Sequence, residues 1–331
     1  MIFLTGATGF LGSHIAEALV KNGHKVRCSV RRTSNRRWID SVDVETVELD
    51  LGTARQALQS SAAEEPRSIE GSVTPAKALE GVEVVIHCGG LTSARNEDEF
   101  MAVNAAGTAE LAKAASAAGV ARFVYISSLA ARGPDGARGP VTPYGRSKLL
   151  GERWLEENKG DMATFVLRPG GIYGARDSAL LPLFQMAMRG WVVVPRSEVP
   201  LQPVYVSDVV TATVAAIDAP TVDKPVEIAG VQKHRWEDLA QVVGAAVGDG
   251  VRVVRVPMAF LRAAGLVSEL GAKLVGRLPA VDRKKIRDIG HHSWTCDIEE
   301  AGRLLEGWKP RVELNDGICL LYTSPSPRDR G

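Results

Sequence analysis

The chain has little of what marks secreted, metal-binding or nucleic-acid-binding proteins. Its 331 residues include four cysteines, without the paired spacing of a disulfide framework or a zinc site: Cys28, Cys88, Cys296 and Cys319. We therefore expect reduced thiols, a cytoplasmic location and no bound metal. The formal net charge is only +1, so bulk charge indicates neither nucleic acid nor an anionic membrane as a partner.

Long uninterrupted apolar runs are also missing. The first apolar run covers only residues 2–4 and is followed by Gly6, so no signal peptide is expected. The best later candidate, residues 258–276, contains Arg262, Glu269 and Lys273. Three charges are too many for a membrane span, and the segment predicts an amphipathic helix instead.

What the chain does have is enough apolar sequence for a large core, since 45% of its residues are hydrophobic. Apolar runs and helical patterns alternate through its first half. Strands are expected at 26–30, 82–87, 123–126 and 164–167, and helices at 10–21 and 103–118. This alternation predicts an α/β protein with a doubly wound parallel sheet. Beyond Arg168 prolines multiply, and helices near 180–189, 209–217, 236–247 and 281–289 predict a smaller lobe.

A glycine turn follows the first apolar run. It reads Thr5-Gly-Ala-Thr-Gly-Phe-Leu-Gly12 and leads directly into an amphipathic helix. Gly6 permits a sharp reversal, Gly9 allows a phosphate to approach the backbone, and Gly12 allows close packing of helix on sheet. The helix N-terminus then points its free amides at the anion. A purely structural turn is the alternative, but the strand before and the helix after favour a dinucleotide site.

A second motif, Tyr144-Gly-Arg-Ser-Lys148, places a phenol and an ammonium on one helical face. Thr142 is a suitable N-cap, and Pro143 suits the first helical position. A free phenol has a pKa of about 10. A cation about 4 Å away, at an effective dielectric constant near 20, is worth roughly 4 kcal/mol, or about three pKa units. Lys148, helped by an oxidised nicotinamide ring, is therefore expected to bring the pKa of Tyr144 towards neutrality.

The two motifs, in this order along the chain, resemble the extended short-chain dehydrogenase/reductase superfamily. That group includes sugar-nucleotide epimerases and dehydratases, 3β-hydroxysteroid dehydrogenases and dihydroflavonol reductases. The resemblance covers roughly residues 1–317. It implies a Rossmann-type cofactor domain over 1–175 and a smaller, partly interleaved C-terminal substrate lobe over 176–317. A small-molecule substrate is implied, and a homodimer is possible.

The resemblance also assigns roles at the site. Tyr144 is the general acid/base, Lys148 lowers its pKa and holds the ribose, and Ser128 hydrogen-bonds the substrate oxygen, with Ser127 as the rival. Further implied cofactor contacts come from the glycine turn, the ends of later strands and one helix: Thr8, Phe10, Leu11, Cys88, Gly89, Gly90, Asn104, Ser127, Pro169 and Ile172. Two alignments compete for the adenine-contacting turn, Asp50-Leu51 and the turn at Ser72, because an insertion separates them.

Cofactor choice depends on the end of the second strand. NAD sites place an acidic residue about 20 residues beyond the glycines. Here that stretch contains no acid and begins with Arg31 and Arg32, which suit a 2′-phosphate. NADP is therefore expected and NAD remains possible, the alternative being a solvated basic loop.

Three functions stay open at this point. The first is an NAD(P)-dependent oxidoreductase acting on a secondary alcohol or ketone. The second is a nucleotide-sugar epimerase or dehydratase with tightly bound NAD, and the third is a non-catalytic NAD(P)-binding sensor or scaffold. Residues 318–331 carry two Ser-Pro steps where the family has a final helix, so they are expected to be a non-native or disordered tail.

Overall fold

The computed structural model describes residues 1–51, 73–135, 138–248, 250–261, 263 and 293–323. Its centre is one seven-stranded sheet with the order β10-β6-β5-β4-β1-β2-β3, and every neighbouring pair is parallel. The strands are β1 (Ile2–Thr5), β2 (Val26–Val30), β3 (Glu45–Glu48), β4 (Val84–His87), β5 (Arg122–Ile126), β6 (Ala163–Pro169) and β10 (Val226–Ile228). The predicted α/β fold with a doubly wound parallel sheet is thus confirmed.

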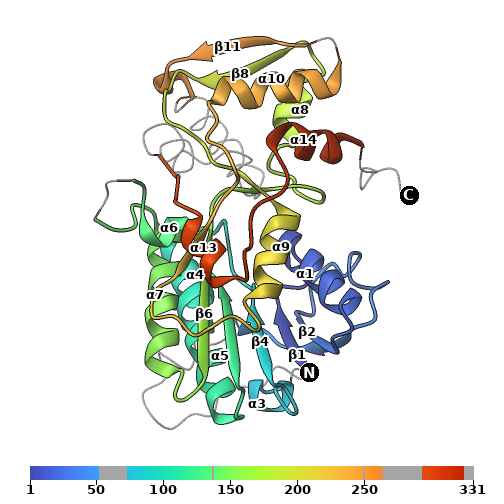
Figure 1. Cartoon of the computed structure of the whole chain (residues 1–331), viewed down its shortest axis with the longest axis vertical. Coiled ribbons are helices and arrows are strands. Elements are labelled where there is room, and N and C mark those ends of the chain that lie inside the picture. The colour runs from blue at the N-terminus through green and yellow to red at the C-terminus, as the bar shows by residue number, and fades with distance from the viewer. Residues whose placement is uncertain (52–72, 136–137, 249, 262, 264–292, 324–331) are drawn as a thin grey trace.

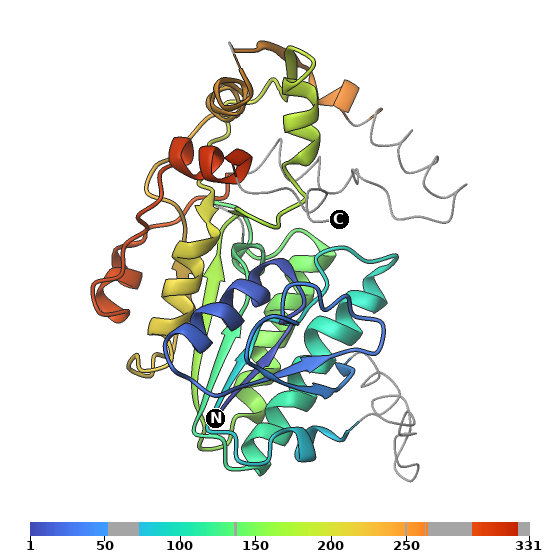
Figure 2. The ribbon, with the colours of Figure 1, turned by 90° about the vertical axis from the view of Figure 1, so that its right-hand side faces the viewer.

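Helices cover both faces of this sheet (Figures 1 and 2). One face carries α1 (Phe10–Lys21) and α9 (Val206–Ala215), which pack on each other. The other face carries α3 (Pro75–Ala78), α5 (Gly107–Ala117) and α7 (Pro143–Asn158). Two hydrophobic cores result, one on each side of the sheet.

The expected helix over 103–118 is divided. It consists of a π-helix, η2 (Met101–Ala106), followed by α5, and the short helix α4 (Glu97–Phe100) precedes it. Such π-helical turns are uncommon and often mark functional sites. Here the turn contains Asn104, whose side chain is buried.

The smaller lobe is built from short pieces. Strands β8 (Trp191–Pro195) and β11 (Arg252–Val256) form a parallel pair beside α8 (Leu181–Ala187) and α10 (Trp236–Val247), at one end of the long axis (Figure 1). Strands β7 (Ile172–Tyr173) and β9 (Val204–Tyr205) form a second pair. The helices expected over 258–276 and 281–289 lie wholly or mostly outside the described residues, as does the insertion before Val73.

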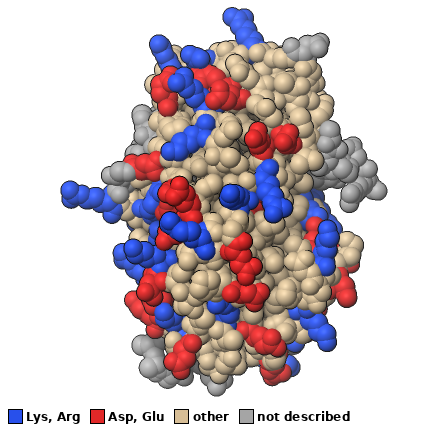
Figure 3. Space-filling model, in the orientation of Figure 1, with Lys and Arg blue, Asp and Glu red and all other residues tan. Residues whose placement is uncertain are grey.

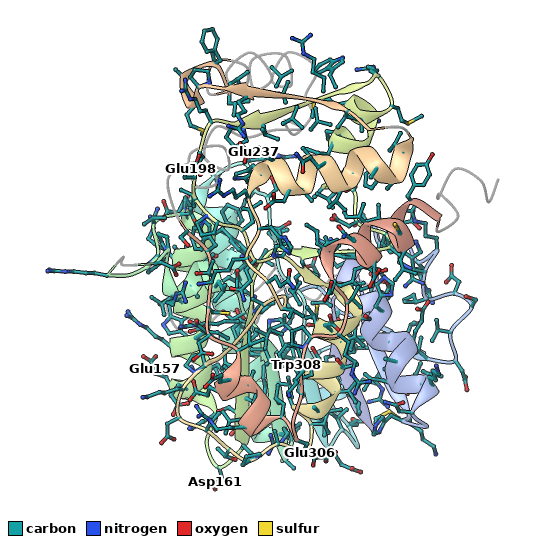
Figure 4. All side chains as sticks on the ribbon, turned by 45° about the horizontal axis from the view of Figure 1, so that its top comes forward. Glu157, Asp161, Glu198, Glu237, Glu306 and Trp308 are labelled. Carbon is teal, nitrogen blue, oxygen red and sulfur yellow. The ribbon has the colours of Figure 1, made fainter. Side chains whose placement is uncertain are left out.

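The chain returns to the sheet after visiting this lobe. Strand β10 forms its edge, and α13 (Glu299–Leu304) packs against β10. Trp308 follows and donates its indole N–H to the carbonyl of Asp208 on α9 at 3.0 Å (Figure 4). Residues from the last third of the chain therefore pack on and stabilise the sheet domain.

The expected tail needs a correction. Helix α14 runs over Leu314–Thr323, past residue 318 where regular structure was expected to end. Ile318 is fully buried, and the ring of Tyr322 stacks on Phe184 of α8 at 6.1 Å. The helix extends to residue 323 because its apolar side packs against the lobe, although the Ser-Pro steps after it favour a loop. The prediction of disorder is wrong for 318–323, while 324–331 lie outside the described residues.

The surface shows no extended region of one charge on the face drawn in Figure 3, where acidic and basic side chains are interspersed. Within the described part of the chain, no helix has the length and apolarity needed to cross a bilayer. The same part contains no group of three or more His, Cys, Asp or Glu side chains suited to a metal ion.

Candidate active site

Helix α7 supplies two of the expected catalytic side chains. Its start is fixed as the sequence predicts: Thr142 accepts a hydrogen bond from the amide of Gly145 at 2.9 Å, and Pro143 occupies the first turn. Tyr144 and Lys148 then lie one turn apart on the same face. The local sequence therefore sets their relative placement.

Lys148 contacts the end of strand β5 in the central sheet. Its side chain is buried, and Nζ donates to the carbonyl of Ile126, at the end of β5, at 2.6 Å. Nζ also lies 4.3 Å from the centre of the Tyr125 ring. A carbonyl and an aromatic face both favour a cation, so the ammonium is fixed where the strand ends.

Ser128 completes the group from the other side. It is the N-cap of α6 (Leu129–Arg132), and its Oγ accepts a hydrogen bond from the amide of Ala130 at 3.1 Å. Its side chain also lies close enough to the phenol of Tyr144 to lower the pKa of that group. The structure thus brings Ser128, Tyr144 and Lys148 together from two segments of the chain.

The proton affinities differ from the expectation. Burial raises the pKa of Tyr144 above its ordinary value, and the charge of Lys148 and the hydrogen bond from Ser128 offset this only in part. Burial likewise lowers the pKa of Lys148, although Tyr144 opposes that change. Lys148 thus acts on the Tyr144 pKa in the predicted direction, but desolvation of the phenolate outweighs this one cation. The prediction that Lys148 and an oxidised nicotinamide together bring the pKa towards neutrality stays a prediction.

Ser127, the rival of Ser128, is already engaged. Its hydroxyl donates to Oε1 of Glu152, a buried residue of α7. Arg168 on β6 donates to the same carboxylate from Nε at 2.9 Å and from Nη2 at 2.5 Å. Glu152 was not among the sequence candidates, although its spacing four residues after Lys148 was a usable signal.

The glycine turn fits a diphosphate. Gly6 has φ +75°, and a Cβ there would lie 2.8 Å from the amide nitrogen of Gly89. A Cβ at Gly12 would lie 2.1 Å from the carbonyl oxygen of Gly6. Helix α1 begins at Gly9 without a side-chain cap and without an acidic residue in its first turn, next to the expected contacts Thr8, Phe10 and Leu11. The first amides thus lack the usual side-chain acceptor, as an anion site requires.

The loop after β4 is fixed by Asn104. Its Oδ1 accepts from the amide of Leu91 at 2.7 Å, and its Nδ2 donates to the Leu91 carbonyl at 2.9 Å and to Ser147 of α7 at 3.0 Å. Gly90 lies beside this amide, and a Cβ on it would be 3.8 Å from Nζ of Lys148. Asn104 therefore connects the expected cofactor loop with the helix that carries Tyr144.

Cys88 and His87, which precede this loop, are not poised to react as nucleophile or base. Burial raises the pKa of the Cys88 thiol to about 11 and lowers the pKa of His87 to about 3. Each ring nitrogen of His87 meets a threonine hydroxyl, that of Thr5 at 2.6 Å and that of Thr108 at 3.0 Å. His87 is thus a packed strand residue.

The remaining expected cofactor contacts lie at strand ends. Leu51 follows β3, and its carbonyl oxygen would be 3.1 Å from a Cβ on Gly107. Pro169 ends β6, and Ile172 begins β7. Asp50, the preferred adenine contact, is described, whereas its rival Ser72 lies outside the described residues, so the choice between the two turns stays a prediction.

Arg31 and Arg32 follow β2 and are exposed. Among the described residues, neither guanidinium has a hydrogen bond or ion pair, whereas the nearby Arg36 donates to Thr46 and pairs with Asp40. These two side chains are therefore free to meet an anion beside the glycine turn.

A parallel sheet with a glycine turn, and a tyrosine one helical turn from a buried lysine, are typical of an enzyme that uses a pyridine nucleotide. The chain belongs to the NAD dependent epimerase/dehydratase family, whose model matches residues 2–229. The predicted membership of the extended short-chain dehydrogenase/reductases, and with it NAD(P)-dependent enzymatic activity, is thereby confirmed.

Individual relatives cover different activities. Ceramide reductase of Caulobacter vibrioides is 31% identical over 96% of this chain and 92% of its own length. A 3 beta-hydroxysteroid dehydrogenase/Delta 5-->4-isomerase of Mycobacterium tuberculosis is 28% identical over 65% of this chain and 59% of its own. The UDP-glucose 4-epimerase of Thermotoga maritima superposes with a TM-score of 0.74 at 21% identity, over 97% of both chains, which shows the shared fold.

Proposed function

We propose that the protein catalyses reversible oxidoreduction between NADP(H) and a secondary alcohol or ketone, with Tyr144 as general acid/base. The observation that carries this proposal is the convergence of Ser128, Tyr144 and Lys148 above the end of β5. A sensor or scaffold has no need of a buried ammonium beside a hydrogen-bonded phenol. Burying such a charge is costly and favours a catalytic use.

The direction of the Tyr144 pKa shift suits reduction of a ketone. A phenol with a raised pKa keeps its proton at neutral pH, so Tyr144 is an acid in its resting state. NADPH, when bound, supplies the hydride that reduces the carbonyl carbon. Tyr144 donates its phenolic proton to the carbonyl oxygen, and the charge of Lys148 stabilises the phenolate that remains. Ser128 donates a hydrogen bond to the same oxygen and thereby orients it.

For cofactor preference we propose NADP(H) over NAD(H). Arg31 and Arg32 stand where a ribose 2′-substituent is expected, are free of other described partners, and meet no competing carboxylate in the segment after β2. A phosphate with two guanidiniums gains charge-assisted hydrogen bonds that a 2′-hydroxyl does not offer.

The proposed substrate is a ketone on an apolar, lipid-like molecule. The relative that matches nearly the whole chain at 31% identity is a ceramide reductase. The lobe beside the site also exposes large apolar side chains, among them Leu181, Met188 and Trp191. An apolar ligand would cover such surface more favourably than a sugar nucleotide would.

The test follows NADPH absorbance with a panel of a ceramide-type ketone, a 3-ketosteroid and a small aliphatic ketone, alongside UDP-glucose assayed for epimerisation. The expected result is NADPH oxidation with a ketone and no change in UDP-glucose. Epimerisation of UDP-glucose without net oxidation of added NADPH would contradict the proposal and establish the epimerase alternative.

A further inference from the structure

We infer that Glu152 is a positioning residue that holds Ser128 against Tyr144, through Ser127 and through a chain of ion pairs reaching the segment that returns from the smaller lobe. The inference rests on the proposed function in one respect, namely that Ser128 and Tyr144 act on the same substrate oxygen. It adds Glu152, Arg168 and Glu227, which are not among the expected contacts to substrate or cofactor.

Three side chains share one face of α7 at intervals of four residues: Tyr144, Lys148 and Glu152. The carboxylate of Glu152 is one of the charges that oppose the lowered pKa of Lys148. It accepts the hydroxyl hydrogen bond of Ser127, the residue immediately before Ser128. A single helix face therefore carries the proton donor, its cation and the anchor for the strand end that presents Ser128.

Both sides of Ser128 are tied into this arrangement. On one side Ser127 is bound to Glu152. On the other side Ser128 starts the single-turn helix α6, whose last residue, Arg132, donates from Nη1 to Glu227 of β10 at 2.6 Å. A one-turn helix has little stability of its own, so its placement depends on such contacts.

Arg168 connects the Ser127–Glu152 hydrogen bond with the Arg132–Glu227 ion pair. Its guanidinium pairs with Glu152 on one side, and its Nη1 lies 4.0 Å from Oε1 of Glu227 on the other. The alternating series Glu152–Arg168–Glu227–Arg132 thus runs between the two ends of the Ser128 segment. The Glu152 and Arg168 side chains are only 7% and 13% exposed, so water screens this pair weakly.

The series continues into the segment that returns from the lobe. Arg132 Nη2 pairs with Asp135 at 2.7 Å and donates to the carbonyl of Thr295 at 3.0 Å. Asp135 in turn accepts from the hydroxyls of Ser293 and Thr295, at 2.5 and 2.7 Å. The position of Ser128 is therefore connected to a segment more than 150 residues later, and a shift of that segment would be felt at the serine.

The experiment reads the Tyr144–Ser128 hydrogen bond directly in the full-length protein. Tyrosine labelled with ¹³C at Cζ gives five signals, because the chain has five tyrosines, and the Tyr144 signal is the one lost in Tyr144→Phe. Ser128→Ala should shift this signal. Ser127→Ala and Glu152→Gln should shift it in the same direction, and Ser127→Ala should add nothing once Ser128 is alanine.

Glu97→Gln is the matched control. Glu97, on α4, forms an exposed ion pair with Arg146, which lies on the opposite side of α7 from Tyr144. It should leave the Tyr144 signal in place. Ser127→Ala leaves the buried ion pair intact, so it carries the test if the Gln variant does not fold. With the ketone that turns over best, Ser127→Ala should lower kcat by up to about 10²-fold, as small misplacements do.

The inference is overturned if Ser128→Ala shifts the Tyr144 signal and Ser127→Ala and Glu152→Gln do not, or if Glu97→Gln shifts it equally. It is also overturned if Ser128→Ala leaves the signal in place, because no bond then exists to be positioned. Failure of the proposed function is seen separately, as absence of ketone turnover by the parent protein while the signals behave as described.

Discussion

The sheet domain and the smaller lobe handle charge and apolar surface differently. Around the site, charges are buried and paired between distant segments, as in Arg168–Glu152. In the lobe the pair Arg235–Glu198 is far more open, with side chains 65% and 78% exposed. Seven of the exposed large apolar residues lie in the lobe: Leu181, Met188, Trp191, Val254, Phe260, Leu320 and Tyr322.

The difference indicates a division of labour. Exposed pairs contribute little energy and fix little geometry, whereas buried, hydrogen-bonded pairs define positions closely. This contrast fits the proposal that the chemistry takes place in the sheet domain and that the lobe selects the substrate. Substitutions in the sheet domain should therefore change the rate and cofactor binding. Substitutions in the lobe should change stability and substrate preference.

The largest effect is expected from Lys148→Ala in the sheet domain. It should remove the charge that stabilises the Tyr144 phenolate and lower the rate by about 10²–10⁴-fold, the range typical of acid–base groups. Cofactor affinity should fall as well, because Lys148 is expected to hold the ribose. Steady-state rates and fluorescence titration with NADPH measure both, and Arg146→Ala on the exposed side of α7 is the control. Unchanged NADPH affinity in Lys148→Ala would show that the ribose role is wrong.

Ile318→Ala should test the lobe in the opposite sense. Ile318 lies on α14 and is fully buried. Its truncation to alanine should lower the free energy of unfolding by about 2–5 kcal/mol, as truncation of buried isoleucines does. NADPH affinity should nevertheless stay at the parent value, since α14 packs on α10 and not on the cofactor turn. Leu320→Ala, at a position 48% exposed, is the matched control and should cost far less in thermal and denaturant unfolding. Equal stability of the Ile318 and Leu320 variants would mean that α14 does not contribute to the folded lobe.

A smaller effect is expected at the end of β2. Arg31→Ala and Arg32→Ala should each weaken NADP(H) binding roughly tenfold or more, which corresponds to the 1.5–3 kcal/mol of a charged hydrogen bond. NAD(H) binding should change little, so the preference for NADP(H) should shrink. Arg36→Ala is the control, because its guanidinium is already bound to Thr46 and Asp40. A parent protein that binds the two cofactors equally would refute the assignment.

The sequence predicts long amphipathic helices better than short strands or helices that depend on distant packing, for a physical reason. Helices α1 and α10 have the predicted bounds, because a long amphipathic period is a strong local signal. Strand β10 escapes prediction since it has three residues and owes its pairing to β6, more than 50 residues earlier. Helix α14 was missed because its stability comes from packing on the lobe, which local sequence does not show.

At the site, spacing within one motif identifies Tyr144 and Lys148 and the family resemblance adds Ser128, whereas the supporting contacts made by folding are missed. Tyr144 and Lys148 are one helical turn apart, so their spacing is visible directly. The bond between Ser127 and Glu152 joins β5 to α7, and the partner Arg168 comes from β6. The same limit applies to the Tyr144 pKa, because desolvation depends on everything packed around the ring.

The central claim is that Tyr144 is the acid/base, and single-turnover reduction of a ketone by NADPH bound to Tyr144→Phe tests it most directly. The phenyl ring preserves packing and removes only the transferable proton. The account predicts NADPH affinity close to that of the parent protein and a hydride-transfer rate lower by about 10²–10⁴-fold. A variant that binds NADPH normally and keeps most of the parent rate would contradict the account.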